Sequence, residues 1–469
     1  MSALTDFFKS SGFYFFGNIL SKLIMFFLLP VYTSYISTES LGYYDVSYTY
    51  LNLITTFLFV DIYVGIMRFI FDEHDTSNMG KPIFNGLIIF NGSLFLYTAT
   101  AIVLWFLFDI RYIGYIYIYG VCLTTNSLLG YLARALGRNK LFAITGVIST
   151  LVTSSLNVVG IAVLKGDIEV LYMSAIVGLI VQIVLLERSI NIRSHLSFRF
   201  YDKALLGRLF RYSIPLSLNS LAFWLLTGYT NIMISHMMGL EANGIYMVAA
   251  KFGVAINLLA TCFNLAWQEI AFKKGNDDKA ELGRFYSRAI NLLINFFGIG
   301  GALLIPVCYI IFPFFVKGDY VASQDIIPLY IIVSVFAVIS SFLGQAYAAI
   351  KATKVIMYST LTACAVNLLL VPLFISLIGL KGAVIGMMIS YLVNVVMRIV
   401  ILRRYVNISL NYKNLLSLLP LLIVTFVVFY SGNLWGNILL CIFILGLAMY
   451  VFRDFLKPIL EIIRSHKND

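Results

Sequence analysis

The chain has 469 residues, of which 61% are hydrophobic and only 12% are charged, and its formal net charge is +11. Soluble domains are typically about 45–50% apolar and about 25% charged, so the composition excludes an ordinary soluble protein. The apolar residues lie in runs of about 18–28 along the whole length, and a membrane-spanning helix needs about 20. The sequence therefore predicts an all-α polytopic membrane protein.

The apolar runs predict about 14 transmembrane helices. In chain order they cover residues 11–33, 44–68, 82–108, 112–134, 141–164, 168–187, 212–239, 243–271, 288–316, 326–350, 355–378, 381–402, 413–430 and 434–452. The connections are short, apart from 188–211 and 272–287.

The basic residues predict the orientation of these spans. If the N-terminus is cytoplasmic, 27 of the 33 lysines and arginines fall on the cytoplasmic side, four fall outside and two lie within spans. This asymmetry follows the positive-inside rule, with both termini in the cytoplasm. Tyrosines at 43, 44, 48 and 50 mark a predicted outer edge, where rings favour the headgroup level. The positive charge is therefore a topology signal, and nucleic acid is not expected as a partner.

An internal repeat divides the chain. A shift of 202 residues aligns Gly42 with Gly244 and Tyr44 with Tyr246, each pair opening an even-numbered span. Each half holds six spans, an even number, so both halves enter the membrane from the same side and the repeat is parallel. The predicted domains are pseudo-symmetric six-helix lobes at 1–190 and 212–404, a cytoplasmic amphipathic linker at 191–211, and two additional helices with a cytoplasmic tail at 405–469.

Two lysines lie inside predicted spans. Lys22 is central in span 1, and Lys251 lies in span 8. A charged residue at the bilayer centre costs about 3 kcal/mol or more, so it is retained where it faces a wet cavity or an anionic partner. We therefore expect Lys22 and Lys251 to line a functional cavity.

Other charged residues lie closer to the ends of spans. Asp61 and Arg68 are seven residues apart on one face of span 2, and Glu269 shares a face of span 8 with Lys251. Asp61 and Glu269 are candidates for ion coupling with H⁺ or Na⁺, with a structural carboxyl as the alternative for Asp61. Arg68, Arg134, Glu269 and Arg398 lie near the ends of spans, so their long side chains could instead extend to the polar membrane interface.

The sequence holds no motif for catalysis or for a metal. It contains neither a G-x-x-x-x-G-K-[ST] phosphate loop nor an H-E-x-x-H zinc motif, and its cysteines and histidines are scattered. The acidic stretch 72–75 is expected to be a solvated loop rather than a catalytic site. We expect neither a cofactor nor an enzymatic activity.

Several segments resemble bacterial polysaccharide repeat-unit flippases, the Wzx-type proteins that carry O-antigen, capsule or exopolysaccharide units. They are Ser21–Thr33 with Leu41–Val46, Gly65–Phe69, Tyr212–Leu216, Gly244–Tyr246 with Ala250–Phe252, Phe263–Trp267 and Gly379–Ala383. Their order and spacing cover essentially the whole chain. The wider group includes multidrug, oligosaccharidyl-lipid and polysaccharide exporters.

The resemblance implies two six-helix lobes in a V around a central cavity. In related transporters the first two spans of each lobe line that cavity, and Lys22, Asp61, Arg68, Lys251 and Glu269 lie on the corresponding spans. The implied function is to flip a polyprenyl-pyrophosphate-linked oligosaccharide across the bacterial cytoplasmic (inner) membrane. Membrane lipid and the lipid-linked oligosaccharide are the expected partners, with a polymerase and glycosyltransferases as candidate protein partners.

Lys22, Lys251 and Arg68 are the candidate pyrophosphate-binding residues. Two alternatives remain on the same fold: a cation-coupled exporter of drugs or metabolites, and a flippase for the lipid precursor of peptidoglycan.

Overall fold

The computed structural model describes residues 17, 19–72, 79–192, 196–274, 279–350 and 352–453, among which there is no β-strand. The acidic stretch at 73–75 lies outside these residues. Up to residue 200, the elements are α2 (Leu29–Tyr35), α3 (Thr38–Phe59), α4 (Ile62–Asp72), α5 (Gly80–Leu107), α6 (Ile113–Ala135), α7 (Asn139–Asn157), η2 (Val158–Val163), α8 (Ile168–Ile190) and η4 (Phe198–Phe200). They continue with α9 (Lys203–Thr227), α10 (Tyr229–Met238), α11 (Leu240–Lys274), α12 (Lys279–Phe315), η5 (Gly318–Ile326), α13 (Ile327–Ala349), α14 (Thr353–Tyr405), α15 (Tyr412–Tyr430) and α16 (Leu434–Val451). The predicted all-α polytopic fold is confirmed.

Within the described chain, nine helices are long and apolar enough to cross a bilayer, or ten if one bent pair counts as a single span. Most of the difference from the 14 predicted spans has an identifiable reason. Helix α14 contains two predicted spans, which meet at Ile378 and Gly379, where the backbone leaves the helical region. Gly379 has a φ of 65°, which glycine adopts without steric cost. The shorter apolar helices Ile19–Tyr35 and Leu416–Tyr430 lie at the first and thirteenth predicted spans.

The chain forms two compact units. Unit 1 comprises Met1–Met247 with Gly318–Tyr320, and unit 2 comprises Val248–Lys317 with Val321–Asp469. Helices α9 and α10 and the first residues of α11 are therefore part of unit 1. The lobe boundaries expected from the repeat stay a prediction.

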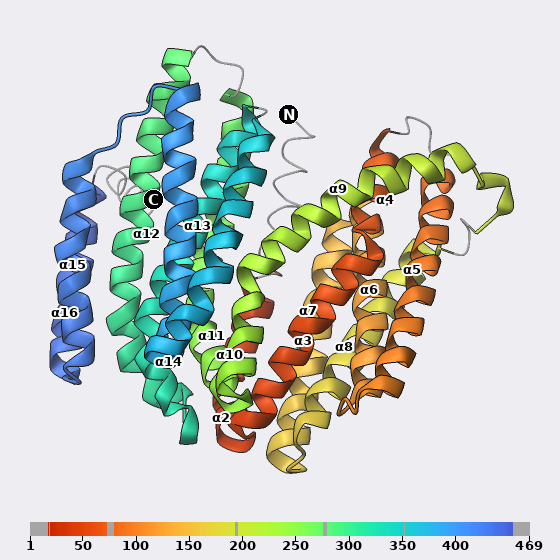
Figure 1. Cartoon of the computed structure of the whole chain (residues 1–469), viewed down its shortest axis with the longest axis horizontal. Helices are drawn as coiled ribbons and strands as arrows, with labels where there is room; N and C mark the ends of the chain where they lie inside the picture. The colour runs from red at the N-terminus through yellow and green to blue at the C-terminus, as the bar shows by residue number, and fades with distance from the viewer. Residues whose placement is uncertain are drawn as a thin grey trace, which may run out of the picture. The chain divides into compact units, whose positions relative to one another are not determined.

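In unit 1, a continuous apolar core joins α3–α6, α8 and the start of α9. Helix α9 begins where the Asp202 carboxylate accepts hydrogen bonds from the backbone N–H groups of Ala204 and Leu205, a typical N-cap. It then packs against α3, α4 and α5 (Figure 1). Leu205 and Leu209, placed in the predicted linker, are buried in this core. At these two positions the apolar face of the linker contacts protein.

The second predicted span is broken in the middle. Helix α3 ends at Phe59, α4 begins at Ile62, and the two helix axes differ by 49°. Val60 and Asp61 between them have φ values of 43° and 50°, a left-handed conformation that is unfavourable for a β-branched residue such as valine.

In unit 2, α13 packs along α14, while α15 and α16 lie side by side next to α12 (Figure 1). A groove of about 410 Å³ runs between α12, α15 and α16, and its lining is mostly apolar, including Ile299, Leu421 and Phe443. None of the predicted site residues lines this groove.

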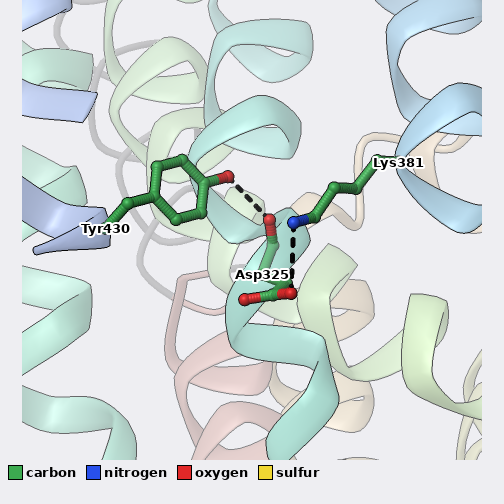
Figure 2. A network of polar contacts seen from close by, with 3 residues as sticks. All are labelled: Asp325, Lys381 and Tyr430. Carbon is green, nitrogen blue, oxygen red and sulfur yellow. Dashed lines mark hydrogen bonds and ion pairs between the residues drawn. The ribbon is translucent and has the colours of Figure 1, made fainter. Parts of the chain in front are cut away.

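A polar contact joins three elements of unit 2. The Lys381 Nζ lies 3.1 Å from the Asp325 Oδ2, and the Tyr430 hydroxyl donates to the backbone carbonyl of Asp325 at 2.7 Å. Figure 2 shows how the three side chains meet. The two charged side chains are 45% and 64% exposed, so water screens their attraction. The contact therefore orients η5 against α14 and α15 more than it stabilises the fold.

Candidate functional site

Lys22 lies in the apolar helix Ile19–Tyr35 of unit 1, and its side chain is exposed. It forms no hydrogen bond or ion pair with another residue that the structure describes. A lysine in an apolar span is stable there only if its surroundings supply water or negative charge.

Lys251 lies on α11 in unit 2, and its side chain is half-buried. Two residues further on, a Cβ on Gly253 would lie 2.5 Å from the Ser334 Oγ, so α11 approaches α13 closely beside Lys251. Lys22 and Lys251 thus belong to different units, and a shared cavity stays a prediction. Glu269 lies on the same helix, but its side chain is outside the described part of the structure.

Asp61 sits at the break between α3 and α4 and is 7% exposed. The Ser220 Oγ of α9 donates to its Oδ2 at 2.6 Å, and the Tyr63 hydroxyl donates to its Oδ1 at 3.1 Å. Hydrogen bonds that end on a carboxylate are stronger than neutral ones. Arg68 lies on α4, seven residues after Asp61, and its side chain is exposed. The structure therefore brings Asp61 to α9 and leaves Arg68 at the surface.

Asp61 is one contact in a polar seam that runs along α3, α4 and α9. The Ser217 Oγ donates to the backbone carbonyl of Thr56 at 3.0 Å, and the Trp224 Nε1 donates to that of Thr49 at 3.3 Å. At Gly65, an added Cβ would lie 2.5 Å from the Ser213 Oγ, so the two helices are close there as well. Donors on α9 thus face backbone or carboxylate acceptors on α3 and the break before α4.

The seam ends in a cluster around Asp45, which the sequence analysis did not assign. The Asp45 Oδ2 accepts from the Asn231 Nδ2 of α10 at 2.7 Å and from the Asn243 Nδ2 of α11 at 3.3 Å. The sequence signal was present, because Asn243 directly precedes Gly244 and Asp45 lies one helical turn after Gly42, the two glycines aligned by the repeat. Their contact depends on how α3 meets α11, which one sequence does not reveal.

A second polar cluster lies in unit 2 around Arg398, which is 5% exposed. Its Nε donates to the Ser359 Oγ at 2.9 Å, and its two terminal nitrogens donate to the Ser340 and Thr360 hydroxyls, each at 3.0 Å. The Tyr347 hydroxyl donates to the backbone carbonyl of Arg398. The expectation that Arg398 reaches the interface is wrong, since hydroxyls inside the bundle hold its guanidinium.

Comparison with known proteins identifies the family. A family model described as polysaccharide biosynthesis protein matches residues 7–267, which is more than half of the chain. The chain belongs to this family. The matched region contains Lys22, Asp61, Arg68 and Lys251, and the resemblance expected from the sequence is confirmed at the level of the family. No curated protein matches this family member closely enough to be counted as a relative.

Solved structures show the same fold at low sequence identity. A lipid II flippase MurJ in an inward closed conformation has a TM-score of 0.65 and 15% identity, with 94% of this chain and 99% of that chain covered. An inward-facing multidrug resistance MATE family transporter of the MOP superfamily has a TM-score of 0.63 and 15% identity, with 81% and 92% covered. An outward-facing MATE transporter of the MOP superfamily has a TM-score of 0.58 and 15% identity, with 88% and 95% covered. This polysaccharide biosynthesis protein is a multi-pass membrane protein with the fold that these flippases and transporters share.

Proposed function

We propose that the protein is a flippase that moves a polyprenyl-pyrophosphate-linked oligosaccharide repeat unit from the inner to the outer leaflet for surface polysaccharide synthesis. The family and the fold support a membrane transporter in polysaccharide biosynthesis. The charge asymmetry of the loops supports an orientation with both termini in the cytoplasm, and the bacterial inner membrane is the location that the resemblance implies. No cofactor or catalytic step is required, because flipping leaves the substrate chemically unchanged.

The observation that carries the proposal is Lys22, an exposed ammonium group on an apolar helix. A pyrophosphate cannot enter hydrocarbon bare, because its charge would lose hydration without compensation. In the proposal, Lys22 and Lys251 replace that hydration, Arg68 contributes near the end of α4, and the polyprenyl chain stays in the bilayer. Outward movement of negative charge in an inside-negative membrane gains about 2.3 kcal/mol per charge per 100 mV, so the potential favours the flip.

Asp61 and Glu269 are the candidates for coupling to H⁺ or Na⁺. Asp61 is suited to respond to an ion, because it is buried and both of its oxygens accept hydrogen bonds. Removing its charge would change its strong bond to Ser220. This link between a carboxylate and α9 also favours the second candidate, a cation-coupled exporter of drugs or metabolites.

The test is complementation of a strain that lacks this chain and has lost its surface polysaccharide. Lys22→Ala and Lys251→Ala are expected to leave the surface bare while lipid-linked repeat units accumulate in the inner leaflet. Lys354→Ala, at an exposed lysine near a helix start, is the matched control and should restore the polysaccharide. Membrane levels of each variant are measured alongside.

Normal polysaccharide in both lysine variants would refute their assignment. Drug resistance on overexpression, with no effect on polysaccharide, would favour the exporter. Death of the deletion strain with arrested wall synthesis would favour a flippase for the lipid precursor of peptidoglycan.

A further inference from the structure

The stretch that precedes α9 is fastened to unit 1 by a buried side chain. Asn85 is 0% exposed, its Nδ2 donates to the backbone oxygen of Phe200 at 2.8 Å, and its Oδ1 accepts from the backbone N–H of Asp202 at 3.0 Å. A Cβ added to Gly80 would lie 2.6 Å from the Phe200 ring. The 3₁₀ helix η4 and the start of α9 are therefore held against α5 (Figure 1).

The first turns of α9 carry three basic side chains away from the core. Leu205 and Leu209 are buried, whereas Lys203, Arg208 and Arg211 are exposed. At 3.6 residues per turn, Lys203 and Arg211 lie on the half of the helix opposite the two leucines, and Arg208 lies at its margin. None of the three forms an ion pair with another residue that the structure describes. Their charge is therefore available to an anion from outside the described chain.

A glycine lies at the centre of this basic face. Gly207 is exposed, and a Cβ added there would meet nothing within 4 Å, so packing among the described residues does not call for a glycine. Glycine inside a helix also costs stability relative to alanine. One use of glycine is to let a ligand approach the backbone closely. The open position between Lys203 and Arg211 is thus suited to receive an anionic headgroup.

Aromatic rings beside this face are left uncovered. Phe198 is 88% exposed, Tyr201 is 52% exposed and Phe210 is 45% exposed. Aromatic rings are favoured at the headgroup level of a bilayer, and basic residues next to exposed apolar ones are typical of a surface that binds membranes. A soluble polyanion would occupy the basic residues and leave the rings in water. The combination therefore favours a lipid surface.

We propose that the start of α9 binds the headgroups of anionic phospholipids in the leaflet that is predicted to face the cytoplasm. Residues 188–211 carry six lysines and arginines against one acidic residue, Asp202, whose carboxylate caps α9. The three basic side chains contact the phosphate around Gly207, while the rings enter the headgroup region. Each basic residue near an anionic leaflet strengthens binding roughly fivefold, so three give roughly a hundredfold. This inference goes beyond the proposed function, because these lipids are bound and not transported.

The test reads lipid contact at the basic face itself. Ala204→Cys, at an exposed position of this face, carries a fluorophore on the full chain in phosphatidylcholine nanodiscs. Spin-labelled phosphatidylglycerol should reach half-maximal quenching at a far lower lipid fraction than spin-labelled phosphatidylcholine. The native cysteines Cys122, Cys308, Cys364 and Cys441 are buried, which limits background labelling. Equal quenching by the two lipids would overturn the inference.

Charge changes then locate the contact. Gly207→Asp should raise the phosphatidylglycerol fraction for half-maximal quenching roughly fivefold or more, whereas Gly207→Asn, its uncharged isostere, should not. Arg208→Gln with Arg211→Gln should raise it roughly 25-fold. Arg403→Gln with Arg404→Gln, at two exposed arginines that end α14, removes the same charge from unit 2 and should leave quenching unchanged. Unchanged quenching in both Gly207→Asp and the α9 double variant would overturn the inference.

Competition separates this site from other anions and from the proposed cargo. Polyprenyl pyrophosphate should displace spin-labelled phosphatidylglycerol no better than unlabelled phosphatidylglycerol does, and inorganic polyphosphate should leave it in place. Displacement by polyprenyl pyrophosphate at a hundredfold lower fraction would assign the face to cargo and overturn the inference, as would full displacement by polyphosphate. Selective quenching in a chain that never restores polysaccharide to the deletion strain would instead refute the proposed function and leave the lipid site standing.

Discussion

The crossing of α3 and α11 makes Gly42→Ala the most informative stability test. The new methyl group would lie 1.9 Å from the Leu240 carbonyl oxygen, so the helices must separate by about 1.5 Å to reach the 3.4 Å of ordinary contact. The obstacle is backbone, which cannot swing aside as a side chain could. Overpacking of this kind typically costs about 1–3 kcal/mol.

A matched control separates this clash from helix propensity. Alanine is favoured over glycine inside a helix by about 0.8–1 kcal/mol, and this gain applies equally to Gly92→Ala in α5. A Cβ at Gly92 meets nothing within 4 Å. The control should therefore be stabilised, while Gly42→Ala should be less stable than the control by the whole clash term, about 1–3 kcal/mol.

The assay is thermal unfolding of the purified protein in detergent. For domains of about 150–250 residues, 1 kcal/mol shifts the Tm by about 2–4 °C, so Gly42→Ala should melt several degrees below Gly92→Ala. A Tm for Gly42→Ala equal to or above that of the control would refute the close crossing. Failure of the control to gain stability would show only that helix propensity is offset in this protein.

Three further predictions concern single contacts. Arg398→Lys should destabilise the protein by about 2 kcal/mol in the same assay, because an ammonium group cannot make all the hydrogen bonds of the planar guanidinium. An unchanged Tm would contradict the hydrogen bonds from Arg398 to the buried hydroxyls. Asp61→Ala should lower the free energy of unfolding by about 1–3 kcal/mol, since the half-buried Ser220 hydroxyl loses its acceptor. Asp61→Ala with Ser220→Ala should recover part of that loss in a double-mutant cycle. Lys381→Gln should lower the free energy of unfolding by less than about 0.5 kcal/mol, and at about 1 M salt it should have no effect. A larger loss would mean that the ion pair with Asp325 is not screened by water.

Much of the fold follows from the sequence because hydropathy determines which segments can cross a bilayer. The turn at Gly379 was predictable, since a glycine interrupts two apolar runs and the structure bends there. The break at Val60 and Asp61 was not predictable, because a β-branched valine strongly disfavours a left-handed backbone and no local signal predicts one there. The bond from Ser220 to Asp61, from a helix 159 residues away in sequence, is the kind of tertiary contact that compensates for such strain.

The site was predictable only in part. The position of Lys22 and Lys251 within apolar runs is enough to predict that each ammonium group needs water or a negative charge nearby. The burial of Arg398 depends on its hydrogen bonds to the hydroxyls of Ser340, Ser359 and Thr360. These tertiary contacts could not be predicted from its position near the end of a span. The role of Asp45 likewise required knowledge of where α3 meets α11.

The proposed function requires the Lys22 and Lys251 ammonium groups to lie in water at membrane depth and to offset an anionic headgroup. Lys22→Cys and Lys251→Cys in proteoliposomes test this directly, through the rate of reaction with a charged, water-soluble thiol reagent. We predict that both react readily, that polyprenyl pyrophosphate slows both reactions about tenfold, and that uncharged polyprenol slows neither. Positions that react only with a lipid-soluble maleimide, or whose labelling ignores the pyrophosphate, would contradict the account.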